Sequence, residues 1–226
     1  MRSSESPIPN PQSRPSYGFS LIELLVALAV FAALAAAAYG GLAQLARTRG
    51  ALAAQQDRLA AVTRAVAAVE RDLRQAVSRS VLGSGRNDVL PALSGVSGGV
   101  ELTRLGYANP RAESRSHLER VAYALDGAAL RRLRYAVLDR APDTVPATTV
   151  LLDRVDELRL RYLGCDGTWR EAWPSSQPPT CGRQIDRTEL LPRAVEFRFV
   201  LPDLGEIRRL VELPSSSPPT AVVVEP

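Results

Sequence analysis

Apolar residues form one unbroken stretch near the start of the chain. From Phe19 to Leu42 the only acidic or basic side chain is Glu23. An α-helix rises 1.5 Å per residue, so about 20 apolar residues cross the roughly 30 Å hydrocarbon core of a bilayer. The pattern predicts a transmembrane helix over residues 19–42, preceded by a polar, proline- and serine-rich segment that ends at Gly18.

Beyond this span, apolar residues return every three or four positions, which places them on one face of a continuing helix. They are Leu59, Val62, Val66, Val69, Leu73, Val77 and Val81. We predict an amphipathic half of the helix over residues 43–82, stopped by the glycines at 83 and 85. A free coiled coil is the alternative, but one apolar stripe is enough to pack against a sheet, and strand-like segments follow.

From residue 86 onward apolar and polar residues alternate, which is typical of half-buried β-strands. Two hairpins are predicted, one turning at Asp126-Gly127 and one at residues 202–205. The pattern predicts no helices of ordinary length between the strands, so the sheet should be mainly antiparallel. The predicted fold class is α+β: a long N-terminal helix packed on a β-rich head over residues 86–213. The proline- and serine-rich residues 214–226 predict a disordered tail.

Charge adds little to this picture. The chain has 28 basic and 24 acidic residues, a net charge of +4, and no lysine. The arginines are spread through alternating segments, which indicates solvated strand and helix faces, so nucleic acid is not expected as a partner. Arg131, Arg132 and Arg134 in particular are predicted to line a solvated strand face.

The two cysteines predict a disulfide. Cys165 and Cys181 lie in a long predicted loop over residues 164–190, and such loops are often functional. In an oxidising compartment they would close a loop of about 16 residues, worth roughly 3 kcal/mol by loop-closure entropy. A metal site is not expected there, because the only histidine, His117, lies far away in the sequence.

Candidate catalytic residues form no recognisable pattern. His117 follows Ser116, but the sequence has no G-x-S-x-G elbow. Asp153, Asp156 and Glu157 lack the alternating oxygen ligands and central glycine of an EF-hand loop, which favours solvated turn acids. The sequence therefore predicts no enzyme, no cofactor, no metal and no small-molecule substrate.

The segment from Gly18 to Glu23, Gly-Phe-Ser-Leu-Ile-Glu, resembles the N-terminal motif of type IV pilins and type II secretion pseudopilins. The resemblance implies that the prepilin peptidase, a membrane aspartyl peptidase, cuts between Gly18 and Phe19. Residues 1–18 would then be a cleaved leader, and the new amine of Phe19 would be N-methylated. Glycine fits this chemistry because an extended chain must pass two aspartates with no side chain before the cut.

Glu23 is the second feature of the motif. A carboxylate buried in lipid costs about 3 kcal/mol or more, so it needs a partner. The freed amine of Phe19, with a pKa near 8, would be cationic and could neutralise Glu23 of a neighbouring helix in a filament. The alternative is an ordinary signal-anchor helix in which Glu23 lies near the membrane interface by chance.

Short segments across the head are similar to the J-type minor pseudopilin of type II secretion. They are residues 101–106, 118–123, 133–140, 191–196 and 204–210, together with Trp169 and Trp173-Pro174. The resemblance implies a non-catalytic subunit of a tip complex with the I-, K- and H-type minor pseudopilins. That complex would prime and cap a periplasmic filament of the major pseudopilin for secretion across the outer membrane. The cysteine pair and the tail match no pattern of this family.

The resemblance also implies a location: the bacterial inner membrane, crossed once, with the head in the periplasm and lipid around the span. Two alternatives remain. A minor pilin of a type IV pilus or competence system shares the N-terminal motif. A membrane-anchored periplasmic binding protein predicts no cleavage after Gly18.

Overall fold

The computed structural model describes residues 18–85, 88–106, 110, 114, 116–177 and 186–214. The chain divides into two compact units, residues 1–56 and 57–226. One helix, α1 (Leu21–Arg74), belongs to both units. Within the described ranges the strands of the second unit are β1 (Val81–Leu82), β2 (Val89–Leu90), β3 (Leu93–Val96), β4 (Gly99–Leu105), β5 (Leu118–Asp126), β6 (Ala129–Tyr135), β7 (Ala147–Leu152), β8 (Glu157–Leu163), β9 (Trp169–Arg170), β10 (Ala194–Leu201) and β11 (Gly205–Glu212).

Ser20 caps the start of α1. Its carbonyl accepts hydrogen bonds from the N–H groups of Glu23 at 3.1 Å and Leu24 at 3.2 Å, and its Oγ accepts from the Glu23 N–H at 3.3 Å. These bonds satisfy amide groups that a helix otherwise leaves unpaired in its first turn. Glu23 lies in that turn, where the helix dipole favours an acid. The helix then runs without interruption through Gly40, Gly41 and Gly50.

The helix ends earlier than the periodicity predicts. It stops at Arg74, not at Leu82, so the glycines at 83 and 85 do not terminate it. The reason is pairing with β4: the Leu105 N–H donates to the Gln75 carbonyl at 2.9 Å, and the Val77 N–H donates to the Thr103 carbonyl at 3.0 Å. Spacing alone cannot separate helix from strand here, because the apolar residues beyond Arg74 are buried by sheet pairing instead.

The head contains two larger sheets in place of the single sheet expected. One has the order β3-β4-β5-β6-β7 and the other β11-β10-β8-β9, with a separate β1-β2 pair. Every pairing is antiparallel, as predicted. Both predicted hairpins are confirmed: Asp126 pairs with Ala129 around Gly127, whose φ is 57°, and Leu201 pairs with Gly205. Positive φ at Gly127 explains why glycine suits that turn.

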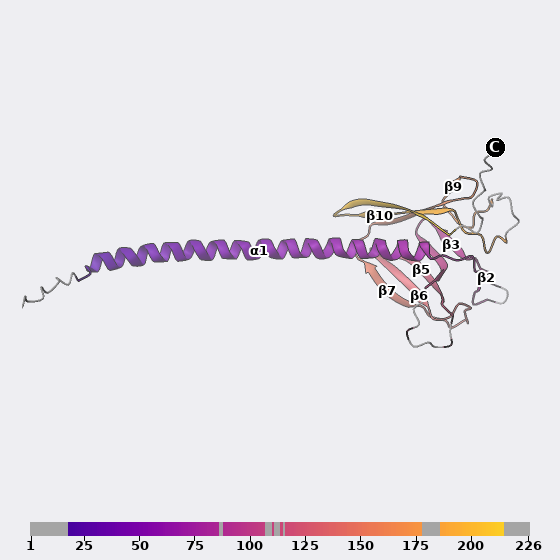
Figure 1. Cartoon of the computed structure of the whole chain (residues 1–226), viewed down its shortest axis with the longest axis horizontal. Coiled ribbons are helices and arrows are strands. Elements are labelled where there is room, and N and C mark those ends of the chain that lie inside the picture. The colour runs from indigo at the N-terminus through magenta and orange to yellow at the C-terminus, as the bar shows by residue number, and fades with distance from the viewer. Residues whose placement is uncertain are drawn as a thin grey trace, which may run out of the picture. The chain divides into compact units, whose positions relative to one another are not determined.

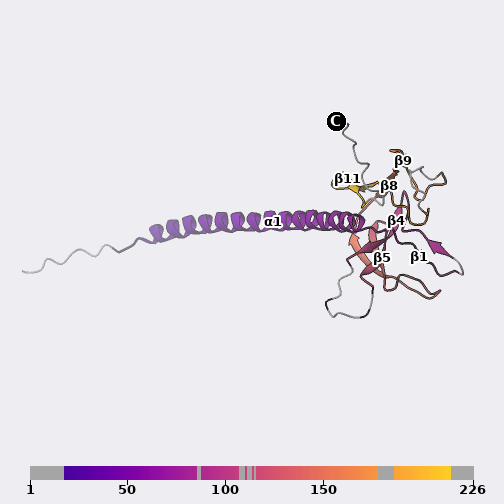
Figure 2. The same ribbon diagram turned by 45° about the vertical axis from the view of Figure 1, so that its right-hand side comes forward.

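The last turns of α1 supply the centre of the core. Figures 1 and 2 show β8, β10 and β11 on one side of these turns and β5 to β7 on the other. One cluster of buried apolar residues joins the helix to both sheets. From the helix it contains Val62, Ala65, Val66, Val69 and Leu73. The predicted packing of an amphipathic helix segment on a β-rich head is therefore confirmed, with the stripe ending at Leu73.

Trp173 ties the predicted 164–190 loop to the core. Its side chain is 2% exposed, and its Nε1 donates to the Leu190 carbonyl at 2.9 Å. Its backbone exchanges hydrogen bonds with Gly95 at 2.7 and 2.8 Å. A Cβ at Gly95 would lie 1.9 Å from the Tyr162 hydroxyl, so a larger residue is excluded there. Cys181 lies outside the described residues, so the Cys165–Cys181 disulfide stays a prediction.

Candidate assembly segment and charged clusters of the head

The N-terminal segment leaves its candidate residues open to other molecules. Phe19 is 85% exposed, and a side chain built on Gly18 would meet no atom within 4 Å. The large apolar residues of α1 as far as Leu52 are likewise exposed. Within the described ranges, no hydrogen bond or ion pair reaches the Glu23 carboxylate. The helix is long and apolar enough to cross a membrane.

Asp72, on the same helix, has the opposite environment. Its carboxylate is completely buried and accepts a hydrogen bond from the Tyr123 hydroxyl at 2.5 Å. Arg132 Nε donates to its Oδ2 at 2.7 Å, and Arg104 Nη1 lies 3.0 Å from its Oδ1. Burial, followed by the charge of Asp72, raises the pKa of Tyr123 well above its usual range. Asp72 therefore joins the last turn of α1 to β5 and β6 through hydrogen bonds from Tyr123 and Arg132, and to β4 through its ion pair with Arg104.

A second buried acid, Glu119 on β5, completes this group, which we call the Asp72–Glu119 cluster. Its carboxylate accepts from Arg134 at 2.6 Å, from Arg104 at 3.0 Å and from Arg132 at 3.3 Å. Burial opposes ionisation, but the hydrogen bonds from Arg134 and Arg104 hold the pKa of Glu119 below its usual range. The two carboxylates thus share the guanidinium groups of Arg104 and Arg132, and Glu119 alone also binds Arg134.

This cluster corrects part of the prediction of a solvated arginine face. The Arg132 side chain is only 12% exposed. Arg134 is 42% exposed although it is bonded to the buried Glu119, and Arg131 is 37% exposed and pairs with Asp126 at 2.8 Å. The prediction is wrong for Arg132 because alternation along β6 says which residues share a face, but not whether another element covers that face.

Arg58 forms a further contact that the sequence analysis missed. Its Nε and Nη2 donate to the Asp203 carboxylate at 2.8 and 3.1 Å. Its Nη1 and Nη2 also donate to the carbonyls of Asp153 at 2.7 Å and Arg154 at 3.1 Å. One guanidinium therefore joins α1 to the β7–β8 loop and the β10–β11 turn. The sequence carried a signal for Asp72, which follows Val69 by three residues and so shares the apolar face, but none for Arg58.

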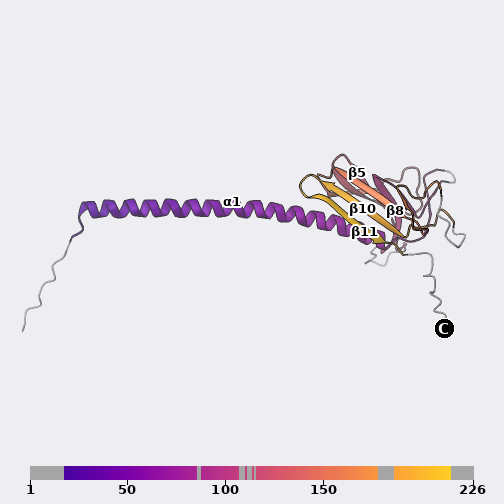
Figure 3. The same ribbon diagram turned by 90° about the horizontal axis from the view of Figure 1, so that it is seen from above.

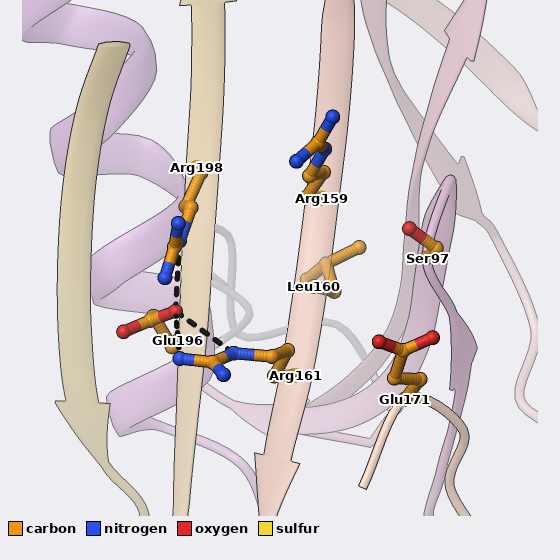
Figure 4. A pocket seen from close by; sticks show the side chains of 7 residues that line it. All are labelled: Ser97, Arg159, Leu160, Arg161, Glu171, Glu196 and Arg198. Carbon is orange, nitrogen blue, oxygen red and sulfur yellow. Dashed lines mark hydrogen bonds and ion pairs between the residues drawn. The ribbon is translucent and has the colours of Figure 1, made fainter.

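The outer face of the four-stranded sheet carries a shallow pocket of about 200 Å³. It is lined by Ser97, Arg159, Leu160, Arg161, Glu171, Glu196 and Arg198. Figure 4 shows Arg161 and Arg198 converging on Glu196, with Ser97 and Glu171 on the far side of β8. Arg161 and Arg198 donate to Glu196 Oε1 at 2.8 and 2.9 Å. The pocket offers charge recognition and holds no nucleophile paired with a base.

Within the described ranges, no group of three or more His, Cys, Asp or Glu residues is placed to hold a metal. His117 and Ser116 lie before β5, where the Ser116 hydroxyl accepts the Leu118 N–H at 3.0 Å. The fold and the open apolar segment together define a class: a membrane-anchored, pilin-like protein with a β-rich head.

Comparison with known proteins identifies the family within this class. Residues 40–213 match the family described as type II secretion system (T2SS), protein J, and residues 13–39 match the prokaryotic N-terminal methylation motif. The chain therefore belongs to the type II secretion system protein J family, and it is a minor pseudopilin. Because the match covers the head, it separates this family from pilus and competence pilins that share only the N-terminal motif.

Individual relatives agree with this assignment. The chain is 31% identical to type II secretion system protein J of Klebsiella pneumoniae, covering 87% of this chain and 94% of that protein. It is 33% identical to the protein J of Escherichia coli, covering 87% and 96%. A chain in the crystal structure of the GspK–GspI–GspJ complex from enterotoxigenic Escherichia coli matches with a TM-score of 0.59 and 27% identity, covering 71% of this chain and 99% of that one. The family is that of a structural pseudopilin.

Proposed function

We propose that this minor pseudopilin joins I-, K- and H-type minor pseudopilins in a tip complex that primes and caps a periplasmic filament of the major pseudopilin. The filament would then serve protein secretion across the outer membrane. The observation that carries the proposal is the combination of a protein J head with an exposed apolar segment, residues 19–42, whose one acid, Glu23, has no partner among the described residues. The GspK–GspI–GspJ complex, which contains a chain similar to this one, supports partners of the I and K types.

Processing of the N-terminus is part of the proposal. The prepilin peptidase would cut between Gly18 and Phe19 in the inner membrane and methylate the Phe19 amine. Nothing in the fold excludes a side chain at Gly18, so a demand for glycine would come from another protein, such as a peptidase whose site must accept an extended chain. The head would face the periplasm, an oxidising compartment in which Cys165 and Cys181 would pair.

Glu23 would act in assembly. In lipid its unpaired carboxylate is costly, and a cationic Phe19 amine on a neighbouring subunit would neutralise it. Because the Ser20 cap already holds the first turn of α1, the carboxylate is not needed to start the helix. Its pairing with a neighbour would set the stagger between helices.

The test is mass spectrometry of the mature full-length chain together with a secretion assay in the host bacterium. We expect the chain to begin at Phe19 with one added methyl group. Gly18→Val should remain uncut, whereas Gly41→Val, with equally open surroundings, should be cut normally. Glu23→Ala should be cut but should lose co-purification with other minor pseudopilins and should reduce secretion.

The outcomes separate the parts of the proposal. A chain that keeps its leader contradicts processing and would favour a signal-anchored protein. Normal secretion by Glu23→Ala contradicts the assembly role of Glu23. Normal processing with no recovery of other minor pseudopilins contradicts the tip complex.

A further inference from the structure

The edge strand β11 is an open, regular edge of the four-stranded sheet. Figure 3 looks onto β8, β10 and β11 side by side, with β11 at the rim. All eight of its residues pair with β10 without a register shift. The other long edge, β7, is interrupted by a shift at Leu130/Arg131, an irregularity that natural proteins use to block strand pairing. No such irregularity protects β11.

The direction of the backbone groups of β11 follows from two hydrogen bonds. The Leu213 N–H donates to the Arg193 carbonyl at 3.0 Å, in the same register as the β10–β11 pairs. The Val200 carbonyl accepts a hydrogen bond from the Asp156 N–H at 2.9 Å, so the backbone N–H and C=O groups of Val200 point away from β11. Because backbone groups alternate along an antiparallel ladder, the odd-numbered residues of β11 face β10. The even-numbered ones, Glu206, Arg208, Leu210 and Glu212, direct their N–H and C=O groups outward.

Among the described residues these outward groups are nearly unoccupied. The Arg208 carbonyl accepts from Arg209 Nη1 at 2.9 Å, and that side chain is half-exposed and can move. The side chains of the outward residues lie on the outer face of the sheet, where Leu210 is 58% exposed. The edge therefore combines free backbone donors and acceptors with an exposed leucine.

The charges beside Leu210 are poorly compensated. Arg208 stands in one row with Arg198 and Arg159, directly opposite one another across three strands. Arg159 and Arg198 have glutamates at 2.6 and 2.9 Å, whereas the nearest glutamate to Arg208 lies at 3.8 Å. Glu212 has no ion pair among the described residues. Leu210 therefore lies between Arg208 and Glu212, two residues from each, and neither charge has a close ion pair among the described residues.

We infer that β11 pairs with β11 of a second copy, in antiparallel orientation about a two-fold axis at Leu210. This register sets Arg208 of each copy opposite Glu212 of the other and brings the two Leu210 side chains together. All three residue pairs expose outward N–H and C=O groups, as an antiparallel ladder requires. The interface uses the same patch on both copies, so it closes at two, and the two sheets become one continuous eight-stranded sheet.

Other registers of self-pairing are poorer. Moving the axis to Arg208 sets the two Arg208 guanidinium groups against each other, and moving it to 209 sets Glu206 against Glu212. An axis at Ile207 does pair Glu206 with Arg208, but only residues 205–209 then overlap, because the turn at 202–204 ends the strand. The axis at Leu210 is the register that satisfies charge and length together. The inference does not rest on the proposed tip role.

The test is sedimentation of the full-length chain in detergent micelles over a range of protein concentrations. We expect a dimer that Arg208→Glu and Glu212→Arg each weaken about tenfold or more, since both like-charged contacts occur twice. The double variant Arg208→Glu/Glu212→Arg restores opposite charges across the axis and should restore the dimer. Because these residues are exposed or edge-facing, the fluorescence of the two tryptophans, Trp169 and the buried Trp173, should stay unchanged in all three variants.

Cross-linking gives an independent readout in the same micelles. Leu210→Cys should cross-link to itself with a short bifunctional maleimide, whereas the matched control Val150→Cys, 44% exposed on β7, should not. A monomer at every concentration would overturn the inference. A dimer that the single charge variants leave intact would also overturn the inference, because the contact would then lie on the apolar helix. A double variant that does not regain the dimer would overturn it as well. Cross-linking of Leu210→Cys to a different protein in cells, without the self-product, would also overturn it.

Discussion

Two acids on the same helix, Glu23 and Asp72, have opposite environments: they differ in burial and in the partners of their carboxylates. Asp72 is buried and surrounded by Tyr123, Arg132 and Arg104, all supplied by its own head. Glu23 lies in an exposed apolar segment and has no partner in the described residues. Asp72 is therefore neutralised by its own head, whereas no described residue supplies a positive charge to Glu23, whose burial in lipid would be costly without one.

The largest predicted effect comes from removing the internally paired acid. Asp72→Ala leaves Glu119 as the one remaining acid beside Arg104 and Arg132 among the described residues, so the free energy of unfolding should fall by about 3–5 kcal/mol. Denaturant titration of the full chain in micelles, followed by Trp173 fluorescence, measures this. Glu70→Ala is the control: its pairs with Arg74 and Arg209 are longer and more exposed, so it should cost about 1 kcal/mol or less. If the two variants lowered the free energy of unfolding equally, the buried Asp72 would be no more important for folding than the exposed Glu70.

Arg58 tests whether a charged side chain near the unit boundary also serves folding. Arg58→Ala should lower the free energy of unfolding by about 1.5–3 kcal/mol, because four hydrogen bonds to the turns at 153–154 and 203 are lost. Arg58→Lys keeps the charge but not the forked geometry and should recover only part of the loss. The exposed Arg64→Ala should change stability by less than about 0.5 kcal/mol. A loss for Arg58→Ala as small as that for Arg64→Ala would contradict the prediction.

The pH dependence of stability sharpens the comparison within the head. The folded-state pKa of Glu119 lies below its ordinary value of 4.5, so the unfolded chain binds its proton first as pH falls. Its stabilisation is present above about pH 4.5 and is lost as pH drops through the folded pKa, with a slope of at most about 1.4 kcal/mol per pH unit. Urea titrations from pH 7 to 3 should show a shallower acid decline for Glu119→Gln than for wild type. If the stability of Glu119→Gln and of the wild type fell equally with decreasing pH, acids other than Glu119 would be responsible for the loss.

The smallest predicted effect is on the unpartnered acid. Glu23→Gln should leave the unfolding transition of the head unchanged within about 0.5 kcal/mol, because no described residue contacts its carboxylate. The same variant should fail to assemble, which separates an assembly role from a folding role. A large loss of head stability would show that Glu23 has an internal partner after all.

Much of this organisation could be predicted from local patterns. The apolar run with Glu23, the stripe through Val62, Val66 and Val69, and the two hairpins all depend on residues close together in the chain, where periodicity and turn preferences apply. The fold class, the antiparallel pairing and the family resemblance followed from them. The helix end at Arg74 could not be predicted, because it is decided by pairing with β4, which lies some thirty residues further along.

The sequence by itself determined which segments are apolar, which residue types lie together on a face and where the pilin-like motif begins. The tertiary structure alone decided which faces are covered. It split the strands into two larger sheets, placed Arg132 beside Asp72, and left β11 at a sheet edge that no other described strand covers. The physical reason is that a charged side chain has the same local pattern whether it meets water or a buried counter-charge. Only elements brought together from distant parts of the chain distinguish the two.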